Sequence, residues 1–554
     1  MKNPLRAIAL FLLAGTAFAD PKIARDLDGR NSNQLVDVII QFKVPPSGND
    51  LRQVSPFGQM RRQFRNMKAI NVRMPERFVH IFKLLPNVAY ISPSRPIKGS
   101  LDITTATVAA NLAWSSNYTG ANVGVAVIDS GIASREDFRN AAGASRVVYS
   151  ESFVEGQTAA DLYGHGTHVA GIIGSAGYSS SGSLFTHTFK GVAPGVQLIS
   201  LKVLDQNGVG NESDVIAAIQ RAIDLKNAYN IRVINLSLGR PVHESYTLDP
   251  LCQAVEAAWK AGIVVVVSAG NYGRDNSRWT RGYGTVASPG NDPYVITVGA
   301  MNAKGTALRA DDSIASYSSK GPTAVDHLVK PDIVAPGNNV VSVMAPNSTL
   351  AVTYSRNLVD NSSYIVGGSG KSSDYFKLSG TSMATPVVSG AAALLLQKDP
   401  TLTPDQVKAR LMKTAVKALN LYTQGIDAYT FESFSNQADI FTVGAGYLDI
   451  PSALANTDKV LLPALSPAVS YDPASRKVTL LRDSSVVWGD SVVWGDSLVW
   501  GSFVFNGALN GSSVVWGDSV VWGDSLSTGF SVVWGDAATQ TIPIQALSAG
   551  GADQ

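Results

Sequence analysis

Short, almost continuous apolar runs alternate with amphipathic segments along the chain from residue 122 onward. Runs of this kind are typical of parallel strands that are covered on both faces. The predicted strands are residues 123–128, 196–204, 233–238, 263–269, 295–300 and 333–335. The alternation predicts an α/β fold, with a mostly parallel sheet, helices on both of its faces and ligands at the carboxyl ends of its strands.

Amphipathic segments between and after these runs predict helices. Ser213 is the expected N-terminal cap of one of them, at residues 213–229. At Thr403 a capping box with proline at the first helical position predicts another helix start. A polar, glycine-led turn at residues 380–386 precedes an apolar run, so a helix is expected to open at Ser382. The predicted helices are residues 213–229, residues 251–261, the helix from Thr403 and residues 387–397.

The first residues have the pattern of a secretory signal. Lys2 and Arg6 precede the apolar run 7–14, and Ala17 and Ala19 are the small residues that a signal peptidase reads. We therefore expect residues 1–19 to be removed and the protein to be secreted, whether extracellular, periplasmic or held at the cell surface. No later apolar run is long enough to predict a transmembrane anchor.

Residues 20–99 are basic. They hold 14 Lys and Arg against 6 Asp and Glu, a net charge of +8. Residues 1–19 add +2, so the total of +2 leaves a net charge of −8 for residues 100–554. Residues 36–42 and 88–92 are predicted strands and residues 56–67 a predicted helix. We interpret the block as a small α+β domain whose charge attracts it to the acidic body of the chain.

Composition narrows the classes of function. A chain of 554 residues is long enough for two or three domains. Its net charge of +2 gives no support for nucleic-acid binding. The single cysteine, Cys252, excludes an internal disulfide framework and a multi-cysteine metal site. Because Cys252 lies among apolar residues, we interpret it as a buried, inert thiol.

Four polar side chains are candidates for catalytic chemistry. Asp129 ends the first strand, His165 lies between glycines, Asn271 follows the strand 263–269, and Ser382 opens a helix. A serine at the positive end of a helix dipole suits a nucleophile whose substrate develops negative charge, and an asparagine amide can stabilise that charge. Each residue type also has a structural use: Asp in turns, Asn in left-handed turns and Ser as a helix cap.

A second histidine, His168, lies three residues after His165. A histidine pair at this spacing could bind a metal ion, but no carboxylate or third histidine in the sequence is placed to complete the ligand set. We interpret His168 as a structural, hydrogen-bonded histidine.

Four motifs, in this order along the chain, resemble those of the subtilisin-like serine proteases. They are Asp-Ser-Gly, His-Gly-Thr-His-Val-Ala-Gly, Ala-Gly-Asn-x-Gly and Gly-Thr-Ser-Met-Ala-x-Pro, and the resemblance covers roughly residues 105–455. The order Asp129, His165, Ser382 is the subtilisin order and differs from that of chymotrypsin and the α/β-hydrolases. The resemblance implies a serine endopeptidase that works through an acyl-enzyme intermediate.

The resemblance also implies a role for each residue. Ser382 attacks the scissile carbonyl, His165 takes and returns the proton, and Asp129 orients the imidazole. Asn271 and the backbone N–H of Ser382 form the oxyanion hole. Ser237, Leu238 and Gly239 match the strand that pairs with an extended substrate, so the expected partners are proteins and peptides.

The sequence departs from the family pattern at three places. Arg240 stands where the family usually has glycine, which predicts a charge beside the substrate cleft. Residues 175–190 do not reproduce the family's calcium loop, so structural calcium is implied by the family alone and no metal residues are assigned. The chemistry itself requires no cofactor. Residues 347–374 are rich in Ser, Gly and Asn and are expected to form a loop near the cleft, or else an unordered insertion.

The family accounts for the basic block as well. Residues 20–99 resemble an inhibitory prodomain, which implies a zymogen that cleaves itself near residues 98–102 and a catalytic domain at residues 100–455. A parallel sheet of high contact order folds slowly, so a domain that assists its folding makes physical sense.

The last part of the chain, residues 456–554, has a different composition. A hexapeptide repeat, Val-Val-Trp-Gly-Asp-Ser, begins at residue 486, and six of the nine tryptophans lie in this tail. Repeats usually stack and Val-Val-Trp favours strands, which predicts a small β-stack or an added β-layer, with a flexible tail as the alternative. The tryptophans motivate the hypothesis that the tail contacts a cell surface or a glycan.

Two functions therefore compete. The first is a secreted serine endopeptidase made as an autoprocessed zymogen. The second is a surface-binding or adhesive repeat protein whose protease-like domain is silent. The presence of Asp129, His165, Asn271 and Ser382 together favours the enzyme, because an inactive relative has no need of all four.

Overall fold

The structure is a computed structural model in which the chain divides into two compact units, Met1–Ile97 and Lys98–Gln554. The residues that it describes are 22–23, 27, 31–64, 68–93, 101–277, 280–428, 430–472, 477–481, 498–500, 503–505, 508–510, 544–546 and 553. In the part of the chain that is described, no helix is long and apolar enough to cross a membrane.

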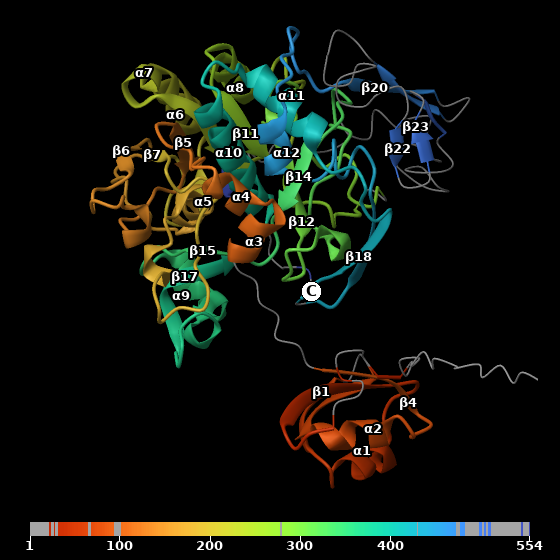
Figure 1. Cartoon of the computed structure of the whole chain (residues 1–554). Helices are drawn as coiled ribbons and strands as arrows, with labels where there is room; N and C mark the ends of the chain where they lie inside the picture. Colours follow the sequence, from red (N-terminus) through yellow and green to blue (C-terminus); the bar gives the residue numbers. More distant parts are fainter. Residues whose placement is uncertain are drawn as a thin grey trace, which may run out of the picture. The chain divides into compact units, whose positions relative to one another are not determined.

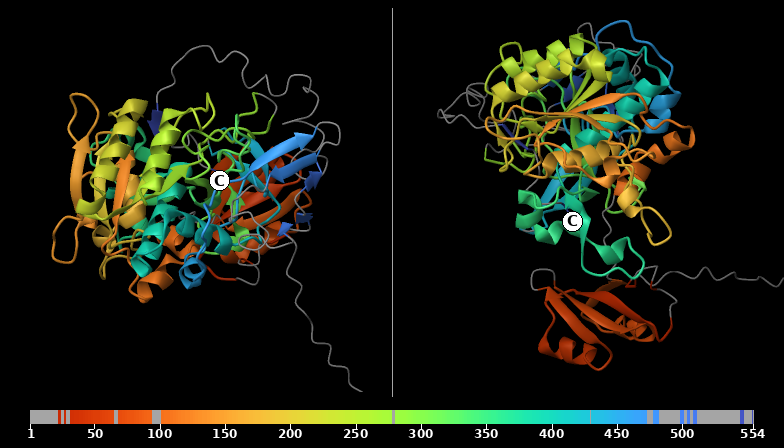
Figure 2. Two further views of the ribbon diagram at one scale, coloured as in Figure 1. Left: turned by 90° about the horizontal axis from the view of Figure 1, so that it is seen from above. Right: turned by 90° about the vertical axis from the view of Figure 1, so that its left-hand side faces the viewer.

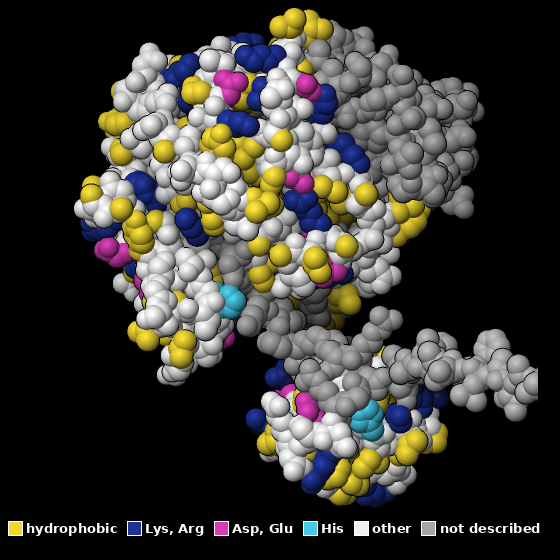
Figure 3. Space-filling view, in the orientation of Figure 1, with side chains coloured by type: hydrophobic (Ala, Val, Ile, Leu, Met, Phe, Trp, Pro, Cys, Tyr) yellow, Lys and Arg dark blue, Asp and Glu magenta, His cyan; other side chains and the backbone are white. Residues whose placement is uncertain are grey.

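The first unit is a four-stranded antiparallel sheet packed against short helices (Figure 1). Its strand order is β2 (Gln59–Phe64), β3 (Ala69–Pro75), β1 (Leu35–Phe42) and β4 (Val88–Pro93), with α1 (Gly48–Val54) and α2 (Val79–Phe82) between strands. The two predicted strands are confirmed. Lys and Arg outnumber Asp and Glu on the face of this unit that Figure 3 shows, in keeping with its net positive charge.

The helix predicted at residues 56–67 is wrong, because this segment contains the edge strand β2. All but one of its residues are exposed, so no alternation of apolar and polar positions marks it as a strand. Its pairing with β3 supplies the backbone hydrogen bonds that the sequence pattern does not reveal.

The second unit is built around a mostly parallel sheet that lies between helices (Figure 2). Its strand order is β13-β12-β11-β9-β5-β7-β6, and β14 also pairs with β12. The strands are β5 (Gly124–Asp129), β6 (Val147–Ser152), β7 (Gln197–Lys202), β9 (Ile231–Leu236), β11 (Val264–Ser268), β12 (Ile296–Asn302), β13 (Ser313–Ile314) and β14 (Ile333–Pro336). Only β13 is antiparallel to its neighbour. All six predicted strands and the α/β class are confirmed, whereas the half-buried β6 lacks the continuous apolar run that marks the others.

Helices cover both faces of this sheet. On one face α6 (Glu212–Asp224) and α8 (Pro250–Lys260) pack together, and on the other α5 (His165–Gly174) packs against α10 (Thr381–Lys398). Helix α6 begins after Asn211 and ends before the short helix α7 (Lys226–Tyr229), so the prediction of Ser213 as its cap is wrong. Helix α11 (Pro404–Thr414) has the predicted capping box at Thr403. Helices α3 (Leu101–Thr107), α4 (Ala110–Ser115) and α12 (Ile450–Ala455) also belong to this unit.

The polar stretch 347–374 is ordered. It contains α9 (Thr349–Thr353), β16 (Leu358–Asp360) and the start of β17 (Lys371–Leu378), which pairs with β16 and β15 (Val340–Val343). The N–H of Thr349 donates to the carbonyl of Leu162 at 2.9 Å. This segment therefore packs against the loop that leads into α5, and the alternative of an unordered insertion is wrong.

Short strands complete the second unit. A hairpin is formed by β18 (Tyr422–Ile426) and β19 (Ser433–Gln437), and the tail contains β20 (Ala468–Asp472), β21 (Lys477–Leu481), β22 (Leu498–Trp500), β23 (Phe503–Phe505) and β24 (Ala508–Asn510). The last strand, β25 (Ile544–Ala546), lies between β8 (Val209–Gly210) and β10 (Leu238–Gly239). Most of the hexapeptide repeat lies outside the described residues. The predicted stacking of the repeats therefore also lies outside them.

Candidate active site

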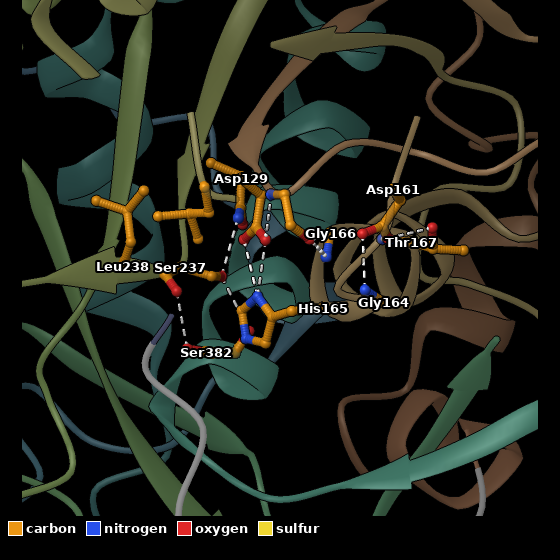
Figure 4. Close-up of polar contacts among 12 residues, drawn as sticks. Asp129, Asp161, Gly164, His165, Gly166, Thr167, Ser237, Leu238 and Ser382 are labelled. Carbon is orange, nitrogen blue, oxygen red and sulfur yellow. Dashed lines mark hydrogen bonds and ion pairs between the residues drawn. The ribbon is translucent and has the colours of Figure 1, made fainter. Parts of the chain in front are cut away.

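The carboxyl end of β5 brings an aspartate to a histidine. Asp129 is the last residue of β5, and its two carboxylate oxygens lie 2.8 and 3.0 Å from Nδ1 of His165, with both side chains fully buried (Figure 4). The backbone N–H of Ser130 also donates to Asp129, at 2.8 Å. Because a carboxylate only accepts hydrogen bonds, this contact places the proton of the neutral imidazole on Nδ1 and leaves Nε2 as an acceptor.

His165 is the first residue of α5, and the start of this helix is held by side chains from outside it. Asp161 accepts hydrogen bonds from the N–H of Gly164 at 2.7 Å and from the N–H of Thr167 at 2.9 Å, while Ser130 Oγ accepts from Gly166 N at 2.9 Å. Ser130 Oγ in turn donates to Asp161 at 2.8 Å. The N–H groups of Gly164, Gly166 and Thr167 are thereby satisfied, and the backbone on either side of His165 is fixed.

Gly166 shows why glycine must follow His165. A Cβ at this position would lie 2.2 Å from the carbonyl oxygen of Gly131 and 3.2 Å from Cβ of Asp129. Any side chain here would therefore push α5 away from the end of β5.

A buried lysine, Lys202 of β7, is the register partner of Asp129 in the sheet. Lys202 Nζ donates to the carbonyls of Ser130 and Leu204, each at 2.9 Å. Burial lowers the pKa of Lys202, although nearby Asp161 raises it. Burial likewise raises the pKa of Asp161, opposed by the hydrogen bonds that it accepts. Sequence reasoning missed both residues, since neither belongs to a motif that predicts this contact.

Ser382 lies in the first turn of α10. Figure 4 shows it beside the edge of the imidazole that faces away from Asp129. Its Oγ donates to the carbonyl of Ser237 at 2.9 Å, and Ser237 Oγ donates back to the carbonyl of Ser382 at 2.9 Å. Among the described residues, His165 Nε2 is buried without a hydrogen-bond partner. The helix begins one residue earlier than predicted, after Gly380, so the alternative role of Ser382 as a cap is wrong.

Asn271 is held by the same turn. Its Oδ1 accepts from the N–H of Thr381 at 2.9 Å and from Thr381 Oγ1 at 3.0 Å, which turns the amide nitrogen the other way. Within the described part of the chain, Asn271 Nδ2 is buried and has no hydrogen-bond partner. The left-handed backbone conformation belongs to Gly270 (φ 109°) and not to Asn271. The described part of the structure therefore presents a buried N–H donor without a partner next to the start of α10.

The three residues predicted to bind an extended substrate follow β9. Ser237, Leu238 and the backbone of Gly239 are buried, and the last two form β10. Behind them, Asn235 Nδ2 donates to Ser237 Oγ at 3.0 Å, and Ser389 Oγ of α10 donates to Asn235 Oδ1 at 2.8 Å. This chain of hydrogen bonds fixes Ser237 to the helix that carries Ser382.

The prediction that Arg240 places a charge beside the cleft is wrong. Only 6% of Arg240 is exposed, and its guanidinium contacts Glu212 at 2.9 Å, Asp249 at 3.0 Å and Glu244 at 3.3 Å. Burial lowers the pKa of Arg240, but its bond to Glu212 and the charges of the three carboxylates raise it by more. The arginine is thus a buried centre of an ion-pair cluster.

His168 and Cys252 have structural surroundings. Nε2 of His168 lies 3.1 Å from the carbonyl oxygen of Phe376 and 3.2 Å from that of Val340, and burial lowers the pKa of His168 to about 3. Burial raises the pKa of the Cys252 thiol well above its usual range. Among the described residues, no three His, Cys, Asp or Glu side chains are grouped to hold a metal ion, and the calcium implied by the family stays a prediction.

Comparison with known proteins places the chain in a family. Residues 120–444 match the sequence profile of the subtilase family. The chain is 40% identical over 336 residues to the serine protease AprX of Bacillus subtilis, across 59% of this chain and 69% of that protein. It is 35% identical over 373 residues to subtilisin E of Bacillus subtilis, across 66% of this chain and 81% of that protein. It is 32% identical over 373 residues to the alkaline protease of Alkalihalobacillus alcalophilus, across 66% and 80% respectively.

Proposed function

We propose, because this chain belongs to the subtilase family of serine endopeptidases, that it hydrolyses peptide bonds with Asp129, His165 and Ser382 through an acyl-enzyme intermediate. One observation carries the assignment of these residues. His165 is bound to the Asp129 carboxylate through Nδ1, while Nε2 is buried, has no hydrogen-bond partner among the described residues, and faces the side on which Ser382 lies (Figure 4).

The reaction begins with a rotation of the Ser382 hydroxyl. Its Oγ leaves the carbonyl of Ser237 and donates to His165 Nε2, which takes the proton as Oγ attacks the scissile carbonyl carbon. The imidazolium that forms is stabilised by the Asp129 carboxylate. It then gives the proton to the leaving amine, and a water molecule hydrolyses the acyl-enzyme by the same steps in reverse.

The negative charge on the substrate oxygen needs donors that are already in place. Asn271 Nδ2 and the backbone N–H of Ser382 supply them, and the bonds from Thr381 to Asn271 Oδ1 hold the amide in this orientation. A donor that is fixed before the reaction pays no reorganisation energy at the transition state. The absence of a hydrogen-bond partner for Asn271 Nδ2 among the residues that the structure describes supports this role.

Protein and peptide substrates bind as extended strands. The short strands β8 and β10 are not neighbours in their sheet, so each offers main-chain groups to a strand placed between them. Main-chain pairing of this kind gives affinity with little dependence on side chains. Ser237, Leu238 and Gly239 form one wall of this site.

The same proposal covers export and maturation. Residues 1–19 direct secretion, and residues 20–99 inhibit the catalytic domain until the enzyme cuts itself near residues 98–102. The net charge of +8 on residues 20–99 supports their attraction to the acidic remainder of the chain. Wild-type protein is expected to release this block, whereas Ser382→Ala protein retains it; equal processing of both in pure samples contradicts self-cleavage.

The tryptophan-rich tail is proposed to contact a cell surface or a glycan. The supporting observation is its composition, since six of the nine tryptophans lie in residues 456–554. A truncated protein that ends at residue 460 is expected to bind cells and glycans less well than the full chain. Equal binding of the two proteins contradicts the idea.

Labelling with a fluorophosphonate probe tests the catalytic assignment. The matured wild type is expected to be labelled, and Ser382→Ala is expected to be inert. If the matured wild type is not labelled, the alternative of a silent protease domain on an adhesive protein is favoured. Labelling that survives Ser382→Ala shows that another residue is the nucleophile.

A further inference from the structure

A strand from the end of the chain fills the site described for an extended substrate. Strand β25 is antiparallel to both β8 and β10 and lies between them. Gln545 pairs with Gly239 on one side and with Val209 on the other. The chain's own C-terminal region therefore makes the main-chain contacts that a substrate needs.

The direction of β25 points it toward the proposed nucleophile. Ala546 pairs with Leu238, and the preceding residue Gln545 pairs with Gly239, so β25 runs toward Ser237. The carbonyl of Ser237 accepts the hydroxyl of Ser382 at 2.9 Å. A strand in this register and direction blocks access of another strand to the same two walls.

A second contact, seven residues further along the chain, anchors the same region. Asp553 is 1% exposed, and its carboxylate accepts from the N–H and the Oγ of Ser316, each at 2.5 Å, and from Arg274 Nη2 at 2.9 Å. Its backbone N–H donates to Asn338 Oδ1 at 2.9 Å, and its carbonyl accepts from Asn338 Nδ2 at 2.8 Å.

This anchor is a built site and not a chance surface contact. Arg274 also pairs with Asp427, and its Nε donates to Ser316 Oγ at 2.7 Å, so the groups around Asp553 hold one another in place. A buried carboxylate is costly unless it is paired and hydrogen-bonded, and here both conditions are met.

The two contacts lie next to the loops that form the proposed active site. Arg274 follows Asn271 by three residues. Asn338 follows Gly337, whose carbonyl accepts the N–H of Gly380 at 2.9 Å, directly before the turn that carries Ser382. The C-terminal region therefore contacts several segments around the proposed active site: β25 contacts β10, and Asp553 contacts the loops that contain Arg274 and Asn338.

We propose that the C-terminal region, through β25 and the Asp553 anchor, is an internal inhibitor that occupies the substrate cleft. This inference rests on the proposed endopeptidase function. It acts in addition to any inhibition by residues 20–99, because it stays on the same chain as the catalytic residues after that block is lost. A substrate must displace β25 before it can bind, so the occupant competes with substrate and leaves the chemical step unchanged.

Two full-chain variants test the proposal. Asp553→Ala removes the anchoring carboxylate, and Gln545→Pro removes the N–H of the central residue of β25. Glu136→Ala serves as the control, since this exposed residue pairs only with Arg139 among the described residues. For both test variants we expect KM for a peptide substrate to fall roughly tenfold with kcat unchanged, because the fraction of open clefts rises. The control should match the wild type.

The outcomes separate this proposal from the proposed function. If both variants hydrolyse peptides with the wild-type KM, the inhibitor proposal is wrong while the endopeptidase function stands. If neither the wild type nor the variants react with a fluorophosphonate, the function itself fails. If mass spectrometry finds the matured wild type cut between residues 546 and 553, the region is a substrate, and the proposal of an intact inhibitor is overturned.

Discussion

Replacing Asp161 with asparagine is expected to misplace His165 without touching any group that meets the substrate. The Asp161 side chain is buried and accepts four hydrogen bonds. One oxygen receives Ser130 Oγ at 2.8 Å and Gly164 N at 2.7 Å, and the other receives Thr167 N at 2.9 Å and Thr167 Oγ1 at 2.5 Å. Asparagine has one oxygen, so one backbone N–H must face an amide NH₂ whichever way the side chain turns.

The size of the effect follows from these contacts. A hydrogen bond to a charged group contributes about 1.5–3 kcal/mol, and two of them are lost, which gives roughly 3–6 kcal/mol. Because burial raises the pKa of Asp161, the neutral amide also removes part of the cost of burying a charge. We therefore expect about 3 kcal/mol, which corresponds to a loss of roughly 10²-fold if all of it falls on the orientation of His165.

Two measurements divide this energy between folding and catalysis. Thermal unfolding is followed in the Ser382→Ala background, where self-digestion is absent, and a decrease of several degrees is expected. Turnover is measured with active sites counted by fluorophosphonate, and kcat should fall roughly 10- to 100-fold with KM within about twofold, since β8 and β10 are unchanged. For turnover alone, Asp292→Asn is the matched control, since Asp292 is a buried aspartate outside the site. Wild-type kcat in Asp161→Asn refutes the positioning role, whatever happens to stability.

Three further changes test other parts of the structure. Asn271→Ala should lower kcat by about 10²–10³ with little change in KM, a magnitude taken over from subtilisin itself; a kcat within tenfold of wild type in steady-state assays contradicts its role as an oxyanion donor. Arg240→Ala leaves three carboxylates unpaired and should destabilise the fold by about 3–5 kcal/mol in denaturant unfolding, while the peptide-library cleavage profile stays the same. Burial raises the pKa of Asp292 to about 7, opposed by Lys330, so the stability that its proton contributes is fully present below about pH 4 and is lost as the pH rises through 7. Asp292→Asn should remove roughly 4 kcal/mol of this pH dependence from unfolding curves in the Ser382→Ala background; an unchanged curve contradicts the assignment.

Most strands of the central sheet could be predicted because a strand that is buried on both faces has a continuous run of apolar residues in the sequence. Strands such as β5 and β11 are buried on both faces, and their apolar runs are continuous in the sequence. The edge strand β2 and the half-buried β6 have no such run, since solvent tolerates polar residues at most of their positions. Pairing partners, and not composition, make these segments strands.

The candidate site divides in the same way. Asp129, His165, Asn271 and Ser382 could be predicted because each lies in a short motif at a strand end or a helix start. The supporting groups could not, because their contacts join distant parts of the chain: Asn235, for example, links Ser237 to α10 through Ser389, 154 residues away. The burial of Arg240 could not be predicted for the same reason, because its ion-pair partners come from α6 and from the loop before α8.

Strand β25 alone is not enough to keep substrates out of the cleft. Main-chain pairing between β8 and β10 accepts any extended peptide, so β25 has no advantage over a substrate from its three residues alone. Its advantage is that it belongs to the same chain, which gives it an effective concentration on the order of mM. The buried carboxylate of Asp553 then decides the competition, because its bonds to Arg274 and Ser316 require an acidic residue at a fixed distance behind the strand. The residues of β25 should therefore tolerate substitutions that keep the backbone N–H, whereas Asp553 should not tolerate replacement without release of the cleft.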